Sequence, residues 1–292
     1  MPRCKQYFLT SQNCSSNIFR FQRPIFKNGT IIKPTYQLGR VVFSVTNCDA
    51  TLERELHSLL PNCADLHPVA DQIYDAKLEG IKNMVGLLNH VLKQHHGLIW
   101  ILGASLMSPD GRKLLILGAP YGGKTTAVLT LVFRCSWKVL SEDVTLIDPG
   151  TNEIINFAAP LALKPGTIEL VKEAASIVPG PVESDRWIPL REHSLGRNVK
   201  TPFDLALYLD LSGGQDKLSC EKMPVNEYVR AMLQTSNLIS MPGSVDKIYE
   251  YVRGDSCYRI TAGSIQQRLK AILQLCDATS SDAVRTYTVG SE

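Results

Sequence analysis

Several kinds of motif are missing from this chain, and each absence narrows what the protein can be. The eight cysteines show no C-x-x-C spacing, so zinc ribbons and thioredoxin-type redox motifs are not expected. No apolar run is long enough to span a membrane, and the first residues, MPRCKQYFLTSQ, lack the hydrophobic core of an export signal. We therefore expect a cytoplasmic protein with no membrane partner and with reduced cysteines.

Strong charge of either sign is also missing. Lysine and arginine are scattered without a long basic run, and the net charge is only +3. This pattern is typical of an ordinary solvated surface and does not favour nucleic acid as a partner. The 44% hydrophobic and 20% charged residues are the proportions of a globular protein, and 292 residues can bury one large core or two smaller ones.

One stretch, LLILGAPYGGKTTAVLTLV at residues 114–132, carries the pattern G-x-x-x-x-G-K-[ST] from Gly118 to Thr125. The apolar piece KLLIL before it suits a buried strand, and TTAVLTLVFR after it has the length and propensity of a helix. Glycines let successive N–H groups curl around an anion, and a helix N-terminus adds unpaired N–H groups. The sequence therefore predicts a loop that binds nucleotide phosphates.

The nature of each side chain in this loop suggests ATP and Mg²⁺ as cofactors. Lys124 can reach the outer phosphates, and the Thr125 hydroxyl suits Mg²⁺, which prefers oxygen ligands. The residues predicted to bind the nucleotide are Gly118, Ala119, Pro120, Tyr121, Gly122, Gly123, Lys124, Thr125 and Thr126.

Two acids, Glu142 and Asp143, follow the apolar strand in WKVLSEDVTLID, the next strand after the predicted helix. Phosphoryl transfer needs a metal and a carboxylate that orients or deprotonates the attacking oxygen. Strand alternation would aim one acid toward the phosphates and the other sideways. A solvated acidic turn is the alternative interpretation, and the residues alone leave it open.

The chain is expected to be an α/β protein with a mixed sheet, in three parts. Residues 1–65 read as a β-rich N-terminal portion, either a substrate-recognition lobe or extra strands on the main sheet. Residues 66–277 form the P-loop core, and residues 278–292 form a loose tail. At the start of the core, apolar residues with helical spacing predict an amphipathic helix: Tyr74, Leu78, Ile81, Val85, Leu88 and Leu92. Gly97 suits its C-terminal cap, and we assign His95 and His96 a structural rather than a catalytic role.

Turn signals predict two hairpins, LIWILGASLM-SPDG-RKLLILG and KVLSEDVTLI-DPGTN-EIINF. The strand that feeds the glycine loop is thus expected to pair antiparallel with its predecessor, whereas parallel strands need a longer crossover. Further along, DLALYLDLS and CYRIT read as strands, and residues 225–235 read as a helix. SIQQRLKAILQLC reads as a helix with a capping box formed by Ser264 and Gln267.

These features resemble the C-terminal domain of HPr kinase/phosphorylase, which has the phosphoenolpyruvate-carboxykinase-like P-loop fold. The resemblance covers roughly residues 85–275 and rests on GAPYGGKTT, WKVLSEDVTLID and APLALKPG. Within that group the chain looks most like stand-alone HPr-kinase-like proteins, some of which phosphorylate a serine on a ribosomally made peptide, for example in lasso-peptide pathways. The resemblance implies an ATP-dependent kinase acting on a serine of a peptide or small protein.

Position by position, the resemblance implies that Lys124 contacts the phosphates, Thr125 binds Mg²⁺ and Glu142 supports the metal through water. It implies that Asp143 is the base that takes the proton from the acceptor hydroxyl. The chain departs from the family at Pro120-Tyr121, where Ser-Gly is usual, and at Gly103, where a histidine is often found. We therefore assign no catalytic histidine. The glycine-rich signature of true HPr kinases is also absent after the acids, so HPr itself is not the expected acceptor.

Other readings stay open at this stage. The segment VESDRWIPLREHSLGRNVK either closes over the site and offers a charge-stabilising arginine, or is a solvated connection; its candidates are Arg186, Arg191 and Arg197. The alternatives to a peptide kinase are a nucleotide-binding regulatory or assembly module without phosphotransfer and a kinase of a small-molecule hydroxyl. The sequence is compatible with a homo-oligomer and does not fix the oligomeric state.

Overall fold

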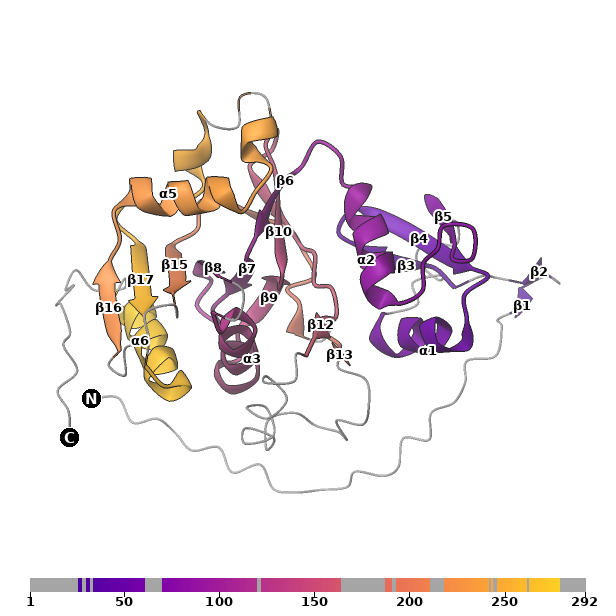
Figure 1. The fold of residues 1–292 in the computed structure, drawn as a ribbon, viewed down its shortest axis with the longest axis horizontal. Helices are drawn as coiled ribbons and strands as arrows, with labels where there is room; N and C mark the ends of the chain where they lie inside the picture. The colour runs from indigo at the N-terminus through magenta and orange to yellow at the C-terminus, as the bar shows by residue number, and fades with distance from the viewer. Residues whose placement is uncertain are drawn as a thin grey trace, which may run out of the picture. The chain divides into compact units, whose positions relative to one another are not determined.

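The protein is a mixed α/β protein with several sheets of parallel and antiparallel strands (Figure 1). The computed structural model describes residues 26–27, 30–31, 34–60, 70–119, 122–163, 187–190, 193–210, 218–241, 243, 246–261 and 263–278. The first 25 residues of the expected β-rich portion, the expected boundary at residues 65–66 and the expected tail beyond Ala278 lie outside the described residues. In the unit Met1–Lys33, β1 (Phe26–Lys27) and β2 (Thr30–Ile31) pair antiparallel; all other elements belong to the unit that starts at Pro34.

The largest sheet has six strands in the order β16-β17-β15-β8-β7-β9. Its strands are β7 (Ala104–Met107), β8 (Lys113–Gly118), β9 (Lys138–Ser141), β15 (Leu205–Asp210), β16 (Ser219–Lys222) and β17 (Cys257–Thr261). As predicted, β8 pairs antiparallel with β7, while it pairs parallel with β15 on its other side. Since β9 is also antiparallel to β7, the C-terminal ends of β8, β9, β15 and β17 all lie along one edge of the sheet.

A second sheet has four strands in the order β14-β11-β10-β6. They are β6 (Ile99–Leu102), β10 (Val144–Asp148), β11 (Glu153–Ile155) and β14 (Val199–Lys200). The predicted hairpin at Asp-Pro-Gly is confirmed, since β10 and β11 pair antiparallel around it. The Asp148 carboxylate accepts a hydrogen bond of 2.8 Å from the Gly150 amide and so stabilises this turn.

The two sequences expected to form single strands, LIWILGASLM and KVLSEDVTLI, are each divided between the two sheets. The first changes sheets at Gly103 and the second at Glu142–Asp143, and the Gly103 amide donates a 3.0 Å hydrogen bond to the Asp143 carbonyl. A Cβ atom at Gly103 would lie 2.8 Å from the Ile116 carbonyl oxygen, so only glycine fits this close crossing. The expectation of continuous strands was therefore wrong because it ignored this tertiary contact.

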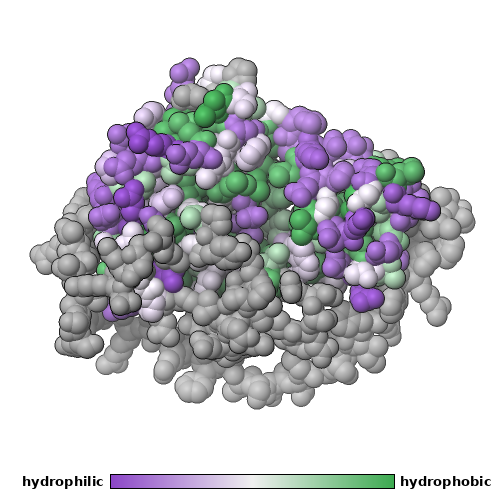
Figure 2. Space-filling view, viewed as in Figure 1, coloured by the Kyte–Doolittle hydropathy of each residue, from purple (hydrophilic) through white to green (hydrophobic). Residues whose placement is uncertain are grey.

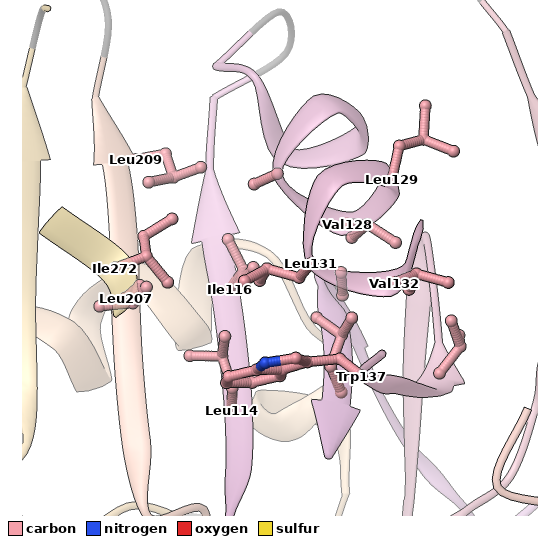
Figure 3. Packing of buried hydrophobic residues seen from close by; sticks show 14 of the residues in the cluster. Leu114, Ile116, Val128, Leu129, Leu131, Val132, Trp137, Leu207, Leu209 and Ile272 are labelled. Carbon is pink, nitrogen blue, oxygen red and sulfur yellow. The ribbon is translucent and has the colours of Figure 1, made fainter. Parts of the chain in front are cut away.

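The six-stranded sheet is buried on both faces, as the alternation along β8 shows. Leu114 and Ile116 pack against α3 (Lys124–Cys135) and α6 (Ile265–Ala278) on one face (Figure 3). Leu115 and Leu117 point to the opposite face, where α5 (Val225–Gln234) and one face of the four-stranded sheet cover them. The predicted helices at α3, α5 and α6 and the predicted strands at β15 and β17 are confirmed.

A third core belongs to a three-stranded sheet, β3-β4-β5, and two helices. The elements are β3 (Tyr36–Leu38), β4 (Val41–Thr46), α1 (Ala50–Leu59), β5 (Gln72–Asp75) and α2 (Met84–Lys93). We call this group the N-terminal lobe; its core includes Leu146 and Ile155 from the outer face of the four-stranded sheet. Helix α1 was not predicted, although Asp49 caps it through bonds from the Thr51 and Leu52 amides.

The helix expected over Tyr74–Leu92 is shorter than predicted. Tyr74 lies in β5, which pairs parallel with β4, and α2 begins only at Met84 after an Asn83 cap. Leu78 is 85% exposed in the intervening turn, and Figure 2 shows hydrophobic surface over β5 and this turn. Gly80 has φ +67, a left-handed conformation that a right-handed helix cannot contain, so no helix runs from Leu78 to Ile81. The apparent periodicity therefore joined a strand and a helix across a turn.

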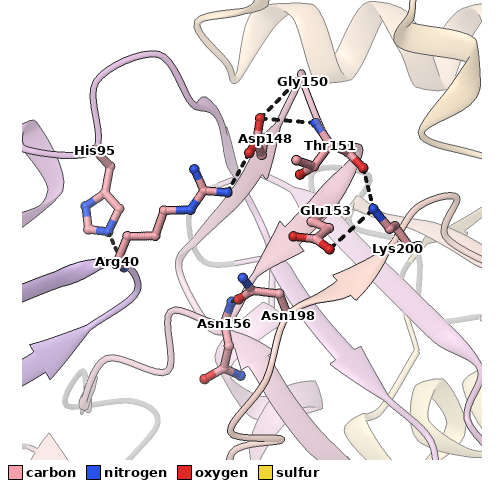
Figure 4. A network of polar contacts seen from close by, with 9 residues as sticks. All are labelled: Arg40, His95, Asp148, Gly150, Thr151, Glu153, Asn156, Asn198 and Lys200. Atoms are coloured by element: carbon pink, nitrogen blue, oxygen red, sulfur yellow. Dashed lines mark hydrogen bonds and ion pairs between the residues drawn. The ribbon is translucent and has the colours of Figure 1, made fainter.

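An ion pair joins the N-terminal lobe to the four-stranded sheet (Figure 4). Arg40 Nη2 lies 2.5 Å from Asp148 Oδ2. Burial raises the pKa of Asp148, but the hydrogen bonds from Arg40 and from Gly150 outweigh it and lower that pKa to about 2. The Arg40 amide also donates a 3.2 Å hydrogen bond to His95 Nε2. Arg40, which directly precedes β4, therefore contacts both the segment after α2 and the β10–β11 turn.

Short elements complete the described structure. Strands β12 (Leu161–Ala162) and β13 (Trp187–Ile188) pair antiparallel, and two 3-10 helices cover Leu238–Ser240 and Ile248–Glu250. The predicted capping box of α6 is confirmed: the Ser264 amide donates to Gln267 Oε1 at 2.8 Å, and the Gln267 amide donates to Ser264 Oγ at 3.3 Å.

Candidate functional site

The glycine loop connects the C-terminal end of β8 to the start of α3 and lies against the end of β15. Gly118 has φ +152 and is in register with Leu209, so a Cβ atom there would lie 2.4 Å from the Leu209 carbonyl oxygen. At Gly122 a Cβ atom would lie 2.9 Å from the Ala119 carbonyl oxygen and 3.1 Å from that of Leu209. Both positions require glycine because the loop passes so close to neighbouring backbone.

Helix α3 begins without a side-chain cap from any described residue. Its N-cap, Gly123, has φ +82 and offers no side chain. The first amides of a helix have no partner within the helix, and its dipole makes this end positive. An uncapped N-terminus that follows a glycine loop at the edge of a sheet is therefore well suited to bind an anion.

The Lys124 ammonium group folds over the loop that precedes it. Its Nζ atom donates to the Gly118 carbonyl at 2.6 Å and to the Ala119 carbonyl at 3.1 Å. The Lys124 ammonium group thus lies over the loop. A bound phosphate could replace the two carbonyls as its hydrogen-bond partner, because a charged phosphate oxygen attracts the ammonium group more strongly than a neutral carbonyl does.

Thr125 and Glu142 meet across the edge of the sheet. The Thr125 hydroxyl donates a 3.1 Å hydrogen bond to Glu142 Oε1, which joins the first turn of α3 to the link between β9 and β10. In a Mg²⁺ octahedron with metal–oxygen distances of about 2.1 Å, adjacent ligand oxygens lie about 3 Å apart. The donor atoms and their separation therefore fit the ion that the sequence predicts.

Asp143 lies beside this pair but makes a different contact. Its side chain is exposed, and its carbonyl oxygen accepts the bond from the Gly103 amide. At Gly103 the Ile116 carbonyl leaves no room for a side chain, so the histidine that the resemblance would allow at this position does not fit. The structure thus places Glu142 in contact with the glycine-loop helix and places Asp143 next to it, open to solvent.

Sequence reasoning missed two charged residues near the loop. Asp210 ends β15, directly after Leu209, which is in register with Gly118. Arg268 of α6 lines a small pocket with residues from the loop, α3, β15 and α6: Gly123, Thr126, Ala127, Leu209, Leu269 and Ile272. The predicted strand DLALYLDLS extended past Asp210 and so gave no sign of a strand end there, and no local signal links Arg268 to a loop so distant in sequence.

The other residues named from the sequence fall into three cases. Pro120, Tyr121, Arg186 and Arg191 lie outside the described residues. Arg197 is exposed, directly after Gly196, which has φ +72. His95 is buried, and its Nδ1 atom donates to the Val91 carbonyl at 3.0 Å, which agrees with the structural role predicted for it.

Searches of family models and of curated proteins found no match to this chain. Within the described ranges, no helix has both the length and the apolar character needed to cross a membrane. The same residues contain no group of three or more histidine, cysteine, aspartate or glutamate side chains that could hold a metal ion. A site built on Thr125 and Glu142 would therefore rely on oxygens from the nucleotide or from water, as Mg²⁺ sites commonly do.

Proposed function

We propose that this protein is an ATP- and Mg²⁺-dependent kinase that transfers the γ-phosphoryl group to a serine hydroxyl of a peptide or small protein. The observation that carries the proposal is the 3.1 Å contact between Thr125 and Glu142 beside an uncapped, glycine-preceded helix. It brings a metal-binding pair to the loop whose sequence matches the phosphate-binding pattern. In this reading β8, the loop and α3 form the P-loop unit of a phosphoenolpyruvate-carboxykinase-like fold, and the protein acts in the cytoplasm.

The loop residues hold and orient ATP. The amides of the loop and of the first turn of α3 bind the phosphates, and Lys124 leaves the carbonyls of Gly118 and Ala119 to contact the outer phosphates. Thr125 and Glu142 would hold Mg²⁺, which would supply positive charge to neutralise the outer phosphates. With ATP bound in this way, the γ-phosphoryl group would lie at the edge of the sheet, next to Asp143.

Asp143 orients the acceptor and removes its proton. Its carboxylate accepts the hydrogen of the serine hydroxyl, whose oxygen forms a bond to the γ-phosphorus as the bond from phosphorus to the β–γ bridging oxygen breaks. ADP leaves with the electron pair of that bond, and the peptide leaves as a phosphoserine product. Exposure of the Asp143 side chain is consistent with this role, since a peptide hydroxyl must reach it.

The test is to incubate the purified protein with Mg²⁺, ATP and a library of serine-containing peptides and to measure phosphate addition by mass. The Asp143→Asn variant should bind ATP normally and lose transfer by roughly a hundredfold or more, because general-base catalysis contributes about this much. Asp255→Asn, at an exposed acid on another loop, is the matched control and should remain active. Full activity of Asp143→Asn would refute the assignment of the base.

One observation favours a second candidate, a nucleotide-binding regulatory or assembly module without phosphotransfer. Gly103 has no space for the histidine that related kinases often carry. Tight ATP binding with no mass shift on any peptide would support this module. Transfer to small hydroxyl compounds but not to peptides would instead identify a metabolite kinase.

A further inference from the structure

Arg268 lies in an unfavourable position for a positive charge. It ends the first turn of α6, where the helix dipole is positive and a cation is destabilised. Its Nε atom is buried and has no hydrogen-bond partner among the described residues. Burial also lowers the pKa of the Arg268 guanidinium, because a buried charge loses its hydration. A bound anion would offset all three costs.

The pocket beside Arg268 is lined in part by the end of the glycine loop and the start of α3. Gly123 and Thr126 line it from the loop side, and Leu209 lines it from the end of β15. Leu209 and Ile272 line the same pocket as Gly123, and Figure 3 shows both of these side chains on the β15 side of β8. The guanidinium therefore shares a pocket with the residues at which the phosphate-binding helix begins.

This pocket lies on a different side of α3 from the metal-binding pair. Thr125 faces Glu142, whereas Thr126 is turned about 100° further around the helix and lines the Arg268 pocket. In phosphate-binding loops the lysine and the metal serve the β- and γ-phosphates, and the loop amides cradle the α- and β-phosphates. A cation on the Thr126 side is therefore placed for the inner end of the polyphosphate.

We propose that Arg268 is a nucleotide-binding residue whose guanidinium contacts the α-phosphate of a nucleoside di- or triphosphate. The inference rests on the proposed function, in that it requires nucleotide in the glycine loop. Nε and a terminal nitrogen of the guanidinium can donate in parallel to two phosphate oxygens, which satisfies the buried Nε. The β- and γ-phosphates are left to Lys124, Thr125 and Glu142.

The experiment measures Mg²⁺-ATP and Mg²⁺-ADP affinity by calorimetry for the full chain and for Arg268→Gln. Losing a charge-assisted contact to a phosphate common to both ligands should weaken ATP and ADP equally, by roughly tenfold to a hundredfold. Lys270→Gln is the matched control, because it removes the same charge from an exposed position on the same helix and should not change either affinity. Weakening of ATP alone would overturn the α-phosphate assignment.

Thermal unfolding without nucleotide separates binding from folding. Arg268→Lys keeps the charge but loses the guanidinium geometry, so it should fold and bind with intermediate affinity even if Arg268→Gln is too unstable to measure. If the unmodified protein binds ATP and both Arg268 variants bind it equally well, only this inference fails. If the unmodified protein does not bind ATP at millimolar concentration, the proposed function itself fails.

Discussion

The Thr125 hydroxyl donates to Glu142 Oε1 at 3.1 Å, so the helix after the glycine loop and the link between two sheets are held together by one side-chain contact. The acid is supplied by a link that joins β9 of one sheet to β10 of the other. The contact therefore depends on how the two sheets meet, and it links the glycine loop to the position of Asp143.

Glu142→Gln should weaken Mg²⁺ binding while preserving the fold. Glutamine can still accept the Thr125 bond through its amide oxygen, but it lacks the negative charge that attracts the metal. We expect the Mg²⁺ concentration needed for half-maximal ATP binding to rise by about tenfold to a hundredfold. Calorimetric titration of ATP at several Mg²⁺ concentrations measures this. Glu153→Gln, at a surface ion pair with Lys200, is the control, and an unchanged Mg²⁺ dependence of Glu142→Gln would contradict the metal assignment.

Gly118→Ala should destabilise the protein more than Gly111→Ala. Both glycines have positive φ, which costs an alanine about 1–2 kcal/mol. Only at Gly118 does the added Cβ atom also meet backbone, the Leu209 carbonyl oxygen at 2.4 Å, whereas nothing lies within 4 Å at Gly111. We expect Gly118→Ala to lose about 2 kcal/mol more free energy of unfolding than Gly111→Ala in urea titrations. Equal losses would show that the loop does not need its close approach to β15.

Protonation of His95 should destabilise the protein as the pH falls below about 6.5. Burial lowers the pKa of His95 from its ordinary value of 6.5, so the folded state favours the neutral ring. Nδ1 donates to the Val91 carbonyl and Nε2 accepts from the Arg40 amide, an arrangement that a ring protonated on both nitrogens cannot keep. The pKa of His95 is lower in the folded than in the unfolded protein. The folding free energy that depends on the neutral ring is therefore fully present above pH 6.5 and is lost on acidification.

The free energy of unfolding should fall by up to about 1 kcal/mol between pH 7.5 and pH 5.5 because of His95. Denaturant titrations at the two pH values measure it, and His95→Gln should flatten this part of the pH dependence. His96→Gln, at the exposed neighbouring position, should leave it in place. A His95→Gln variant with the same pH dependence as the unmodified protein would rule out this histidine as its source.

Ser264→Ala should lower the stability of α6 through loss of its cap. The Ser264 hydroxyl accepts the Gln267 amide at 3.3 Å, and substitutions of this kind cost about 1 kcal/mol. Thermal unfolding midpoints compare it with Ser264→Thr, which keeps a hydroxyl acceptor and should be close to the unmodified protein. If Ser264→Ala unfolds at the same temperature as the unmodified protein, the capping bond contributes nothing to stability.

Local signals in the sequence predicted local structure well. The Pro-Asp-Gly and Asp-Pro-Gly turns predicted both hairpins, and the spacing of Ser264 and Gln267 predicted a capping box that the structure contains. These features depend on backbone preferences within a few residues. The same holds for the strand–loop–helix order around Gly118, which follows from an apolar run, glycines and a helix-forming segment.

Features that depend on contacts between distant residues were not predictable in this way. The stripe from Tyr74 to Leu92 matched helical spacing, yet Tyr74 joined β5 because β4 offers it a parallel partner. The Arg268 pocket forms because α6 packs beside α3, and nothing near Arg268 in sequence points to the loop. The contact of Thr125 with Glu142 was expected only as proximity, since its geometry depends on where two strands change sheets.

The hydrogen bond from the Gly103 amide to the Asp143 carbonyl marks a corner at which two neighbouring chain segments turn together from one sheet into the other. The acidic pair is thus held by main-chain hydrogen bonding, and the buried residues of the two segments that turn here belong to three hydrophobic cores. Substitutions of side chains around the acids should consequently leave the backbone at Glu142 and Asp143 in place, because main-chain contacts rather than side chains shape this corner.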